Sequence, residues 1–202
     1  MMTELISLNS ESPTNRLVLL HGWGADAQDL VPVGQLLTEG FNHCFEIVSL
    51  SAPQVHPSGL GRQWYPLYPH EWEQVPNAVN DLERRINNLG FEKVPLKKTL
   101  LLGFSQGGAM ALELAIRIKF QGVFALSSYP HPNWFPLKEA PPIFLCHGNR
   151  DDVVPKDASQ KSFDILKKNK FESNLYIFEG GHEINKDLID YCRGIIKQKF
   201  LS

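Results

Sequence analysis

Cysteine is scarce in this sequence, and its three copies have no spacing typical of a metal site. Cys146 falls in an apolar run that is typical of a strand, and Cys192 falls on the apolar face of a predicted helix. An odd number of cysteines also fits poorly with a disulfide framework. We therefore expect buried thiols, and we expect neither a metal site nor a bound cofactor.

An excess of charge is also missing. The formal net charge is −2, so the chain has no basic footprint for nucleic acid and no polybasic face for a membrane surface. No apolar run approaches the 18 residues of a membrane span, and residues 1–4 lack the basic and apolar regions of a signal peptide. These absences predict a cytoplasmic protein that binds no nucleic acid and does not insert stably into membranes.

Signs of a domain boundary are lacking as well. The chain shows no internal repeat, low-complexity tract or linker, so we expect one domain over residues 1–202. Apolar runs typical of strands alternate with amphipathic helix patterns, which predicts a mostly parallel sheet with helices on both faces, an α/β fold. The expected strands are residues 4–8, 16–20, 45–50, 99–102, 122–127, 142–146 and 175–178. The expected helices begin near residues 30, 75, 106 and 156, a final helix contains residues 188–196, and the helix that begins near residue 75 ends at Gly90.

One segment has a pattern specific enough to suggest chemistry. An apolar strand ends at Leu102, the sequence Gly103-Phe104-Ser105-Gln106-Gly107 follows, and an Ala- and Leu-rich helix comes next. This is the strand–turn–helix context of a nucleophile elbow, G-x-S-x-G. The glycines permit the close backbone approach of a sharp turn, and the serine hydroxyl lies near the positive end of the helix. The simpler alternative is that Ser105 is a small residue tolerated in a tight turn.

Partners for such a serine stand at the ends of other predicted strands. In an open parallel sheet, functional groups gather beyond the carboxyl ends of the strands. His182 can serve there as a base for Ser105, and Asp151 can orient that imidazole, in the chain order Ser–Asp–His. Asp152 competes directly with Asp151 for this role, and the other aspartate is then free to cap the following helix. His182 can alternatively be an exposed cap after a glycine pair.

Two further histidines precede glycine at strand ends. For His21 and His147 we favour a structural interpretation, a hydrogen-bonded loop histidine in each case. Backbone groups complete the predicted site, because attack on an acyl carbonyl creates an oxyanion that needs preorganised N–H donors. One donor is expected at Gln106, directly after the nucleophile, and the other at Trp23 in the first strand-end loop.

Four segments together resemble the carboxylesterase/phospholipase family of α/β-hydrolases, which includes the acyl-protein thioesterases. They are residues 20–24 (LHGWG), 103–108 (GFSQGG), 147–155 (HGNRDDVVP) and 181–183 (GHE). The resemblance implies a nucleophile at Ser105, an acid at Asp151, a base at His182, and oxyanion donors at Trp23 and Gln106. One departure is that Asp152 stands where the family usually has proline. Residues 63–65 also resemble the aromatic stretch of the family's acyl-binding loop.

The spacing between Ser105 and Asp151 is already filled by a predicted helix, strand and loop, which leaves no room for a cap domain. The predicted cleft is therefore open, and we expect aromatic side chains that suit an apolar acyl group to border it: Trp64, Tyr65, Trp134 and Phe135. Tyr129 belongs to the same proline-rich loop as the last two.

The sequence thus predicts a serine hydrolase that cleaves carboxylic esters or thioesters through an acyl-enzyme, without metal or cofactor. The alternatives are a ligand-binding module that keeps the hydrolase frame without turnover, and a lyase or transferase that uses the same three groups. The sequence leaves open the physiological substrate, the preferred acyl-chain length and the oligomeric state.

Overall fold

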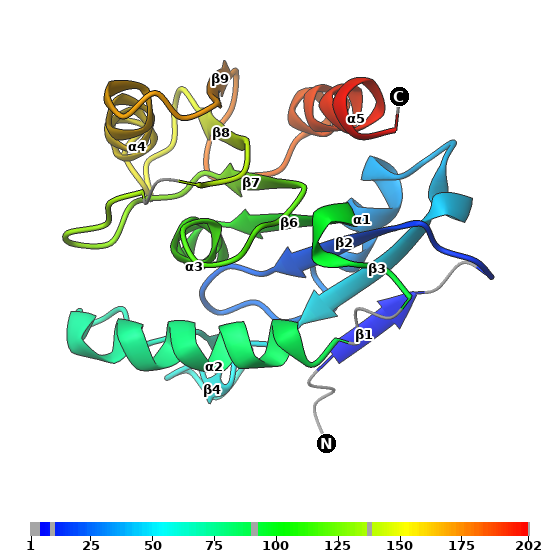
Figure 1. The fold of residues 1–202 in the computed structure, drawn as a ribbon. Helices are drawn as coiled ribbons and strands as arrows, with labels where there is room; N and C mark the ends of the chain where they lie inside the picture. Colours follow the sequence, from blue (N-terminus) through cyan, green and yellow to red (C-terminus); the bar gives the residue numbers. More distant parts are fainter. Residues whose placement is uncertain (1–4, 9–10, 90–92, 137–138, 202) are drawn as a thin grey trace.

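A seven-stranded sheet organises the chain, of which the computed structural model describes residues 5–8, 11–89, 93–136 and 139–201 (Figure 1). The strand order is β1–β3–β2–β6–β7–β8–β9. β1 pairs antiparallel with β3 at one edge, and the other neighbours pair parallel. The strands are β1 (Leu5–Leu8), β2 (Asn15–Leu20), β3 (Phe45–Leu50), β6 (Thr99–Phe104), β7 (Gly122–Leu126), β8 (Ile143–Gly148) and β9 (Ser173–Phe178).

Helices cover both faces of this sheet (Figure 1). The helices are α1 (Val31–Leu37), α2 (Val75–Asn87), α3 (Gln106–Ala115), α4 (Asp157–Lys168) and α5 (Lys186–Phe200). Side chains of α1 and α5 form one buried cluster with the sheet, and side chains of α2, α3 and α4 form the other. Three short 3-10 helices are η1 (Asn42–Cys44), η2 (Trp72–Gln74) and η3 (Leu96–Lys98).

The central strands are apolar along their whole length because both of their faces are covered. In β2, Leu17 and Leu19 belong to the cluster under α1 and α5, whereas Val18 and Leu20 belong to the cluster under α2 and α3. The predicted mostly parallel sheet with helices on both faces is therefore confirmed. Cys146 and Cys192 are buried free thiols, as expected. The predictions for Glu4 and Gly90 lie outside the described residues.

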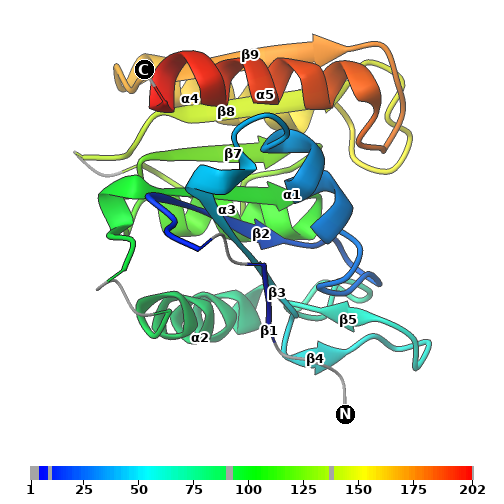
Figure 2. The ribbon, with the colours of Figure 1, turned by 90° about the vertical axis from the view of Figure 1, so that its right-hand side faces the viewer.

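One feature of the fold was not predicted. The long connection between β3 and α2 contains a small antiparallel hairpin, β4 (Gln54–Val55) and β5 (Arg62–Gln63). Figure 2 shows this hairpin on the side of the sheet toward which the arrows of β7 to β9 point. The parallel strands β2, β3 and β6 to β9 have their carboxyl ends on that side, so the hairpin lies among the strand-end loops.

Candidate active site

The turn at Ser105 has the strained backbone of a nucleophile elbow. Ser105 has a φ of 54° and a ψ of −118°, between the end of β6 and the start of α3. A Cβ on Gly103 would lie 2.1 Å from the carbonyl oxygen of Gly107, and a Cβ on Gly107 would lie 2.1 Å from that of Leu20. Both positions therefore require glycine, as the motif implies. The Ser105 N–H donates to the Leu126 carbonyl at 2.8 Å, which ties the turn to β7.

Three side chains that are distant in the sequence meet above this turn. His182 Nε2 lies 3.0 Å from Ser105 Oγ, and His182 Nδ1 lies 2.7 Å from Asp151 Oδ2. With Nδ1–H donating to the carboxylate, the neutral imidazole presents Nε2 as an acceptor to the serine hydroxyl. The ring of His182 also packs against Phe104, with 4.8 Å between the ring centroids. The arrangement can therefore move a proton from Ser105 to His182.

Asp151 is held as a carboxylate. Burial acts to raise its pKa, but hydrogen bonds from His182 and from the backbone N–H groups of Val154 and Val153 outweigh it, so the pKa lies below the ordinary value. Those two N–H groups donate to Oδ1 at 2.8 and 3.0 Å, which leaves Oδ2 for the imidazole. The ionised acid can stabilise a cation on His182.

Asp152 does not compete for this position. It is exposed, and the hydrogen bond to His182 comes from Asp151. The expectation that the other aspartate caps the following helix is wrong, because the residue before α4 is Lys156 and no side chain caps that helix. Asp151 Oδ1 accepts from the N–H groups of Val153 and Val154, and Asp151 Oδ2 faces His182. The same side chain thus stabilises the loop and orients the imidazole.

His21 and His147 are both fully buried and hydrogen-bonded. His21 Nδ1 pairs with the Gly22 carbonyl, and its Nε2 accepts from the Ala52 N–H at 2.9 Å. His147 pairs with Ser159 Oγ and the Val154 carbonyl, at 2.7 and 2.8 Å. Burial lowers the pKa of both imidazoles. Their structural interpretation agrees with this geometry. The sequence did not reveal that His147 Nε2 also lies 3.2 Å from Asp151 Oδ2.

The backbone N–H groups of Gln106, the residue after Ser105, and of Trp23, which lines the same cavity as Ser105, were both predicted as donors. Gln106 is the first residue of α3, where N–H groups have no partner within the helix. Trp23 lies in the loop after β2, whose Gly24 N–H donates to the Arg62 carbonyl. Within the described residues, no acceptor is hydrogen-bonded to the N–H of Trp23 or of Gln106. Both groups are thus free to donate to a ligand.

Hydrogen bonds fasten these two segments to residues 63–65. The buried amide of Gln106 accepts from the Trp64 N–H at 3.0 Å and donates to the Tyr65 carbonyl at 2.8 Å. The Trp64 indole donates to the His21 carbonyl at 2.9 Å, and the Trp23 indole donates to Gln63 Oε1 at 2.9 Å. Residues 63–65 therefore connect the elbow with the loop after β2.

A cavity of about 450 Å³ opens in front of Ser105 and His182. Val153 and Tyr68 are exposed at its rim. The remaining lining residues are mostly apolar or aromatic: Trp23, Leu67, His70, Trp72, Tyr129, Val154, Pro155 and Ala158.

The four aromatic residues expected to border the cleft do not line this cavity, which corrects that expectation. Trp64 and Tyr65 are 1% and 0% exposed, because their hydrogen bonds to Gln106 and His21 hold them behind the site. Trp134 is buried, with its indole donating to the Leu112 carbonyl, and Phe135 is 55% exposed. These two line a separate hollow next to α2 and α3.

The cavity wall instead includes Leu67, Tyr68 and His70, which were not predicted from the sequence, and Tyr129, whose place in the wall was not predicted either. The aromatic content of residues 51–72 was a signal for such a wall. It did not reveal which rings face the serine.

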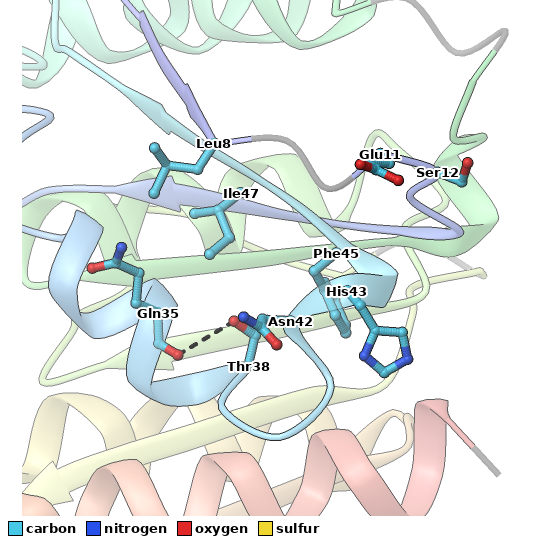
Figure 3. A pocket seen from close by; sticks show the side chains of 9 residues that line it. All are labelled: Leu8, Glu11, Ser12, Gln35, Thr38, Asn42, His43, Phe45 and Ile47. Carbon is cyan, nitrogen blue, oxygen red and sulfur yellow. Dashed lines mark hydrogen bonds between the residues drawn. The ribbon is translucent and has the colours of Figure 1, made fainter.

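A larger hollow of about 760 Å³ lies between β3, α1 and the segment after β1 (Figure 3). Ser12, Glu11 and His43 all line it. Within the described ranges no hydrogen bond joins these three side chains, so the hollow contains no linked set of nucleophile and base. We therefore place the candidate site at the smaller cavity, where proton transfer is geometrically possible.

The described residues contain no group of three or more His, Cys, Asp or Glu side chains that could hold a metal ion. No helix formed by them combines the length and the apolar character that crossing a bilayer requires.

Comparison with known proteins gives consistent matches. Acyl-protein thioesterase 1 homolog 1 of Dictyostelium discoideum is 31% identical over 138 residues, 64% of this chain and 59% of the relative. Acyl-protein thioesterase 1 of Emericella nidulans is 40% identical over 82 residues, 35% of this chain and 34% of the relative. The chain thus spans between about a third and three fifths of the length of these curated relatives.

A structural comparison covers the chain more fully. The crystal structure of esterase PE8 superposes with a TM-score of 0.88 at 27% identity, over 98% of this chain and all of the other. The fold is thus the α/β-hydrolase fold. The model of the phospholipase/carboxylesterase family matches residues 2–198. Since that match covers nearly the whole chain, the protein belongs to the phospholipase/carboxylesterase family of α/β-hydrolases.

Proposed function

We propose that this protein is a serine hydrolase that cleaves carboxylic esters or thioesters through an acyl-enzyme. The observation that carries the proposal is the continuous hydrogen-bonded line from Asp151 through His182 to Ser105, at 2.7 and 3.0 Å. Membership of a family of phospholipases and carboxylesterases supports the same reaction class. The names of the curated relatives favour an acyl thioester or ester as the bond that is cleaved.

In the proposed first half-reaction, Ser105 Oγ attacks the carbonyl carbon while His182 Nε2 takes the hydroxyl proton. A new Oγ–carbon bond forms, and the carbonyl electron pair moves onto oxygen. The N–H groups of Trp23 and Gln106 donate to that oxyanion. The carbonyl then re-forms, the bond to the leaving oxygen or sulfur breaks, and the leaving group takes the proton from His182.

In the proposed second half-reaction, water enters where the leaving group was. His182 takes a proton from this water, and the water oxygen attacks the acyl carbon. The bond to Ser105 breaks, Oγ recovers its proton from His182, and a carboxylic acid leaves. Asp151 remains ionised throughout and stabilises the imidazolium in both halves, which its lowered pKa favours.

The mostly apolar cavity in front of Ser105 suits an acyl chain. Its rim residues Tyr68 and Val153 are exposed, which fits an open site that admits substrate directly from solvent. The organisation of residues 1–202 as one domain and the cytoplasmic location remain predictions.

The test is the hydrolysis of a short p-nitrophenyl ester by the Ser105→Ala variant. We expect loss of turnover by at least about 10³-fold with an unchanged melting temperature, because only the nucleophile is removed. Ser58→Ala is the matched control. Its hydroxyl also pairs with an imidazole, His56, at 2.7 Å, but it is exposed and should leave turnover unchanged. Turnover retained by Ser105→Ala refutes the assignment, and an inactive wild-type protein would favour the binding module.

A further inference from the structure

A second hydrogen-bonded line of side chains leads from α3 to the wall of the candidate active site. Glu113 Oε1 lies 3.0 Å from His131 Nδ1, and His131 Nε2 lies 2.8 Å from the Tyr65 hydroxyl. The Tyr65 hydroxyl lies 2.8 Å from that of Tyr129. Trp72 packs against the rings of Tyr65, Tyr129 and His131, with centroids 5.9 to 6.4 Å apart. Four hydrogen-bonded side chains and the ring of Trp72 thus form one packed array.

With the His131 imidazole in its neutral form, the carboxylate at one end determines the direction of every hydrogen bond in this line. An ionised Glu113 can only accept, so His131 Nδ1 carries a proton and donates it. The neutral imidazole then has only Nε2 left as an acceptor, and the Tyr65 O–H donates to it. Because the Tyr65 proton is used in this way, its oxygen accepts from the Tyr129 O–H. The Tyr129 hydroxyl thus donates toward the core and keeps its lone pairs for another donor.

Tyr129 lies in the cavity wall, where the direction of its hydrogen bond affects which ligand groups it can bind. It lines the cavity together with Ser105 and His182, whereas Tyr65 behind it is fully buried. Burial raises the pKa of Tyr129 to about 12, so the phenol remains protonated at neutral pH. Much of the surrounding wall is apolar or aromatic, including Leu67, Trp72 and Val154. A hydrogen-bond acceptor in such a wall discriminates among ligands, because an unmatched polar group loses its bond to water on binding.

We propose that Tyr129 is a specificity-determining residue whose oxygen accepts a hydrogen bond from a hydroxyl or amide N–H on the acyl chain of the substrate. The inference rests on the proposed function and narrows its substrate class to acyl groups that carry a donor. Glu113, His131 and Tyr65 are positioning residues that act through Tyr129.

The test compares three families of p-nitrophenyl hexanoates at pH 8, above the ordinary pKa of histidine. One carries no substituent, one carries a hydroxyl at successive chain carbons, and one carries the matching methyl ether. The ether accepts but cannot donate. We expect kcat/KM for the best hydroxy ester to exceed that of its ether about tenfold. In Tyr129→Phe this ratio should fall to about one.

Two variants separate this role from a merely structural one. Glu113→Gln replaces a pure acceptor with a group that can donate, so the line can reverse and the hydroxy-to-ether ratio should also approach one. Tyr191→Phe is the matched control, because it removes another hydrogen-bonded phenol. Tyr191 lies on α5, and its hydroxyl donates to Asn174 at 2.8 Å. Tyr191→Phe should preserve both the hydroxy-to-ether ratio of kcat/KM and the activity toward the unsubstituted ester.

Each outcome decides the proposal. A hydroxy preference that Tyr129→Phe abolishes supports it. A preference for the ether, or no preference while turnover still depends on Ser105, overturns this inference and leaves the proposed hydrolase intact. A preference that survives in Tyr129→Phe assigns the selection to another residue. A wild-type protein that cleaves none of the esters overturns both proposals.

Discussion

Two regions of this molecule contain the same sequence of groups, a carboxylate, an imidazole and a hydroxyl. In the first, Asp151 and His182 lead to Ser105, with hydrogen bonds of 2.7 and 3.0 Å. In the second, Glu113 and His131 lead to Tyr65, with hydrogen bonds of 3.0 and 2.8 Å. Distances alone do not distinguish the two.

The difference lies in what surrounds the hydroxyl. Ser105 stands on a strained turn at a cavity, next to the free N–H of Gln106. The Tyr65 hydroxyl is fully buried and already bonded to Tyr129, so a carbonyl carbon has no access to it. A line of three groups becomes a nucleophilic site only where the hydroxyl is accessible and an oxyanion can be stabilised. The other line can only orient a side chain.

The largest expected effect on kcat comes from substituting the imidazole of each line in turn. His182→Gln should lower kcat for an ester substrate by at least about 10⁴-fold, because Ser105 loses its base. His131→Gln should lower kcat by less than about tenfold, since its ring contacts no reacting atom. Steady-state kinetics on the purified variants measures both, and equal losses would abolish the distinction between the two regions.

Next in size is the effect of the carboxylates. Asp151→Asn should lower kcat about 10³- to 10⁴-fold, because the amide no longer stabilises the imidazolium. Asp152→Asn, one residue away and exposed, should change kcat by less than about twofold. The reverse ranking in the same ester assay would transfer the acid role to Asp152.

A smaller effect, on stability, is expected from the hydrogen bonds that join Gln106 of the elbow to residues 63–65. Gln106→Ala removes two buried hydrogen bonds to Trp64 and Tyr65, and should lower the free energy of unfolding by about 1–3 kcal/mol. Gln160→Ala is the control, because its amide donates to Asp164 on an exposed helix face. Urea denaturation followed by circular dichroism measures both, and equal stabilities would show that the fastening contributes nothing.

The smallest effect concerns the dependence of stability on pH. Burial lowers the folded-state pKa of His147, so as pH falls through the unfolded value of about 6.5 the unfolded chain binds this proton more readily than the folded chain does. Stability should therefore decrease as pH falls from 7 to 5, and less steeply in His147→Gln. The lowered pKa of Asp151 acts in the same direction but only below about pH 4. Identical slopes of melting temperature against pH in both proteins would contradict this account.

The sequence predicted the arrangement of Ser105, Asp151 and His182 and an open cleft beside them, but not which side chains line that cleft. Each of the three follows a parallel strand, and parallel strands bring their carboxyl ends to one edge of the sheet, so their proximity follows from strand assignment. Glycines around Ser105 marked the strained turn directly.

The wall of the cavity depends on contacts that have no periodic signal. The side chain of Gln106 binds the backbone of the buried residues Trp64 and Tyr65, and Tyr129, which lines the cavity, pairs with the Tyr65 hydroxyl. The strands of the β4–β5 hairpin have two residues each, which is too short for an alternating pattern. The direction of a ring in such a segment is set by tertiary packing.

The central claim is that Ser105, and no other hydroxyl, is activated by its imidazole. The most direct measurement is labelling with a fluorophosphonate, followed by mass spectrometry of the digested protein. We predict one adduct, on the peptide that contains Ser105, and its loss in His182→Gln but not in His131→Gln. An adduct on a different residue, or labelling of Ser105 that is unaffected by His182→Gln, would contradict the account.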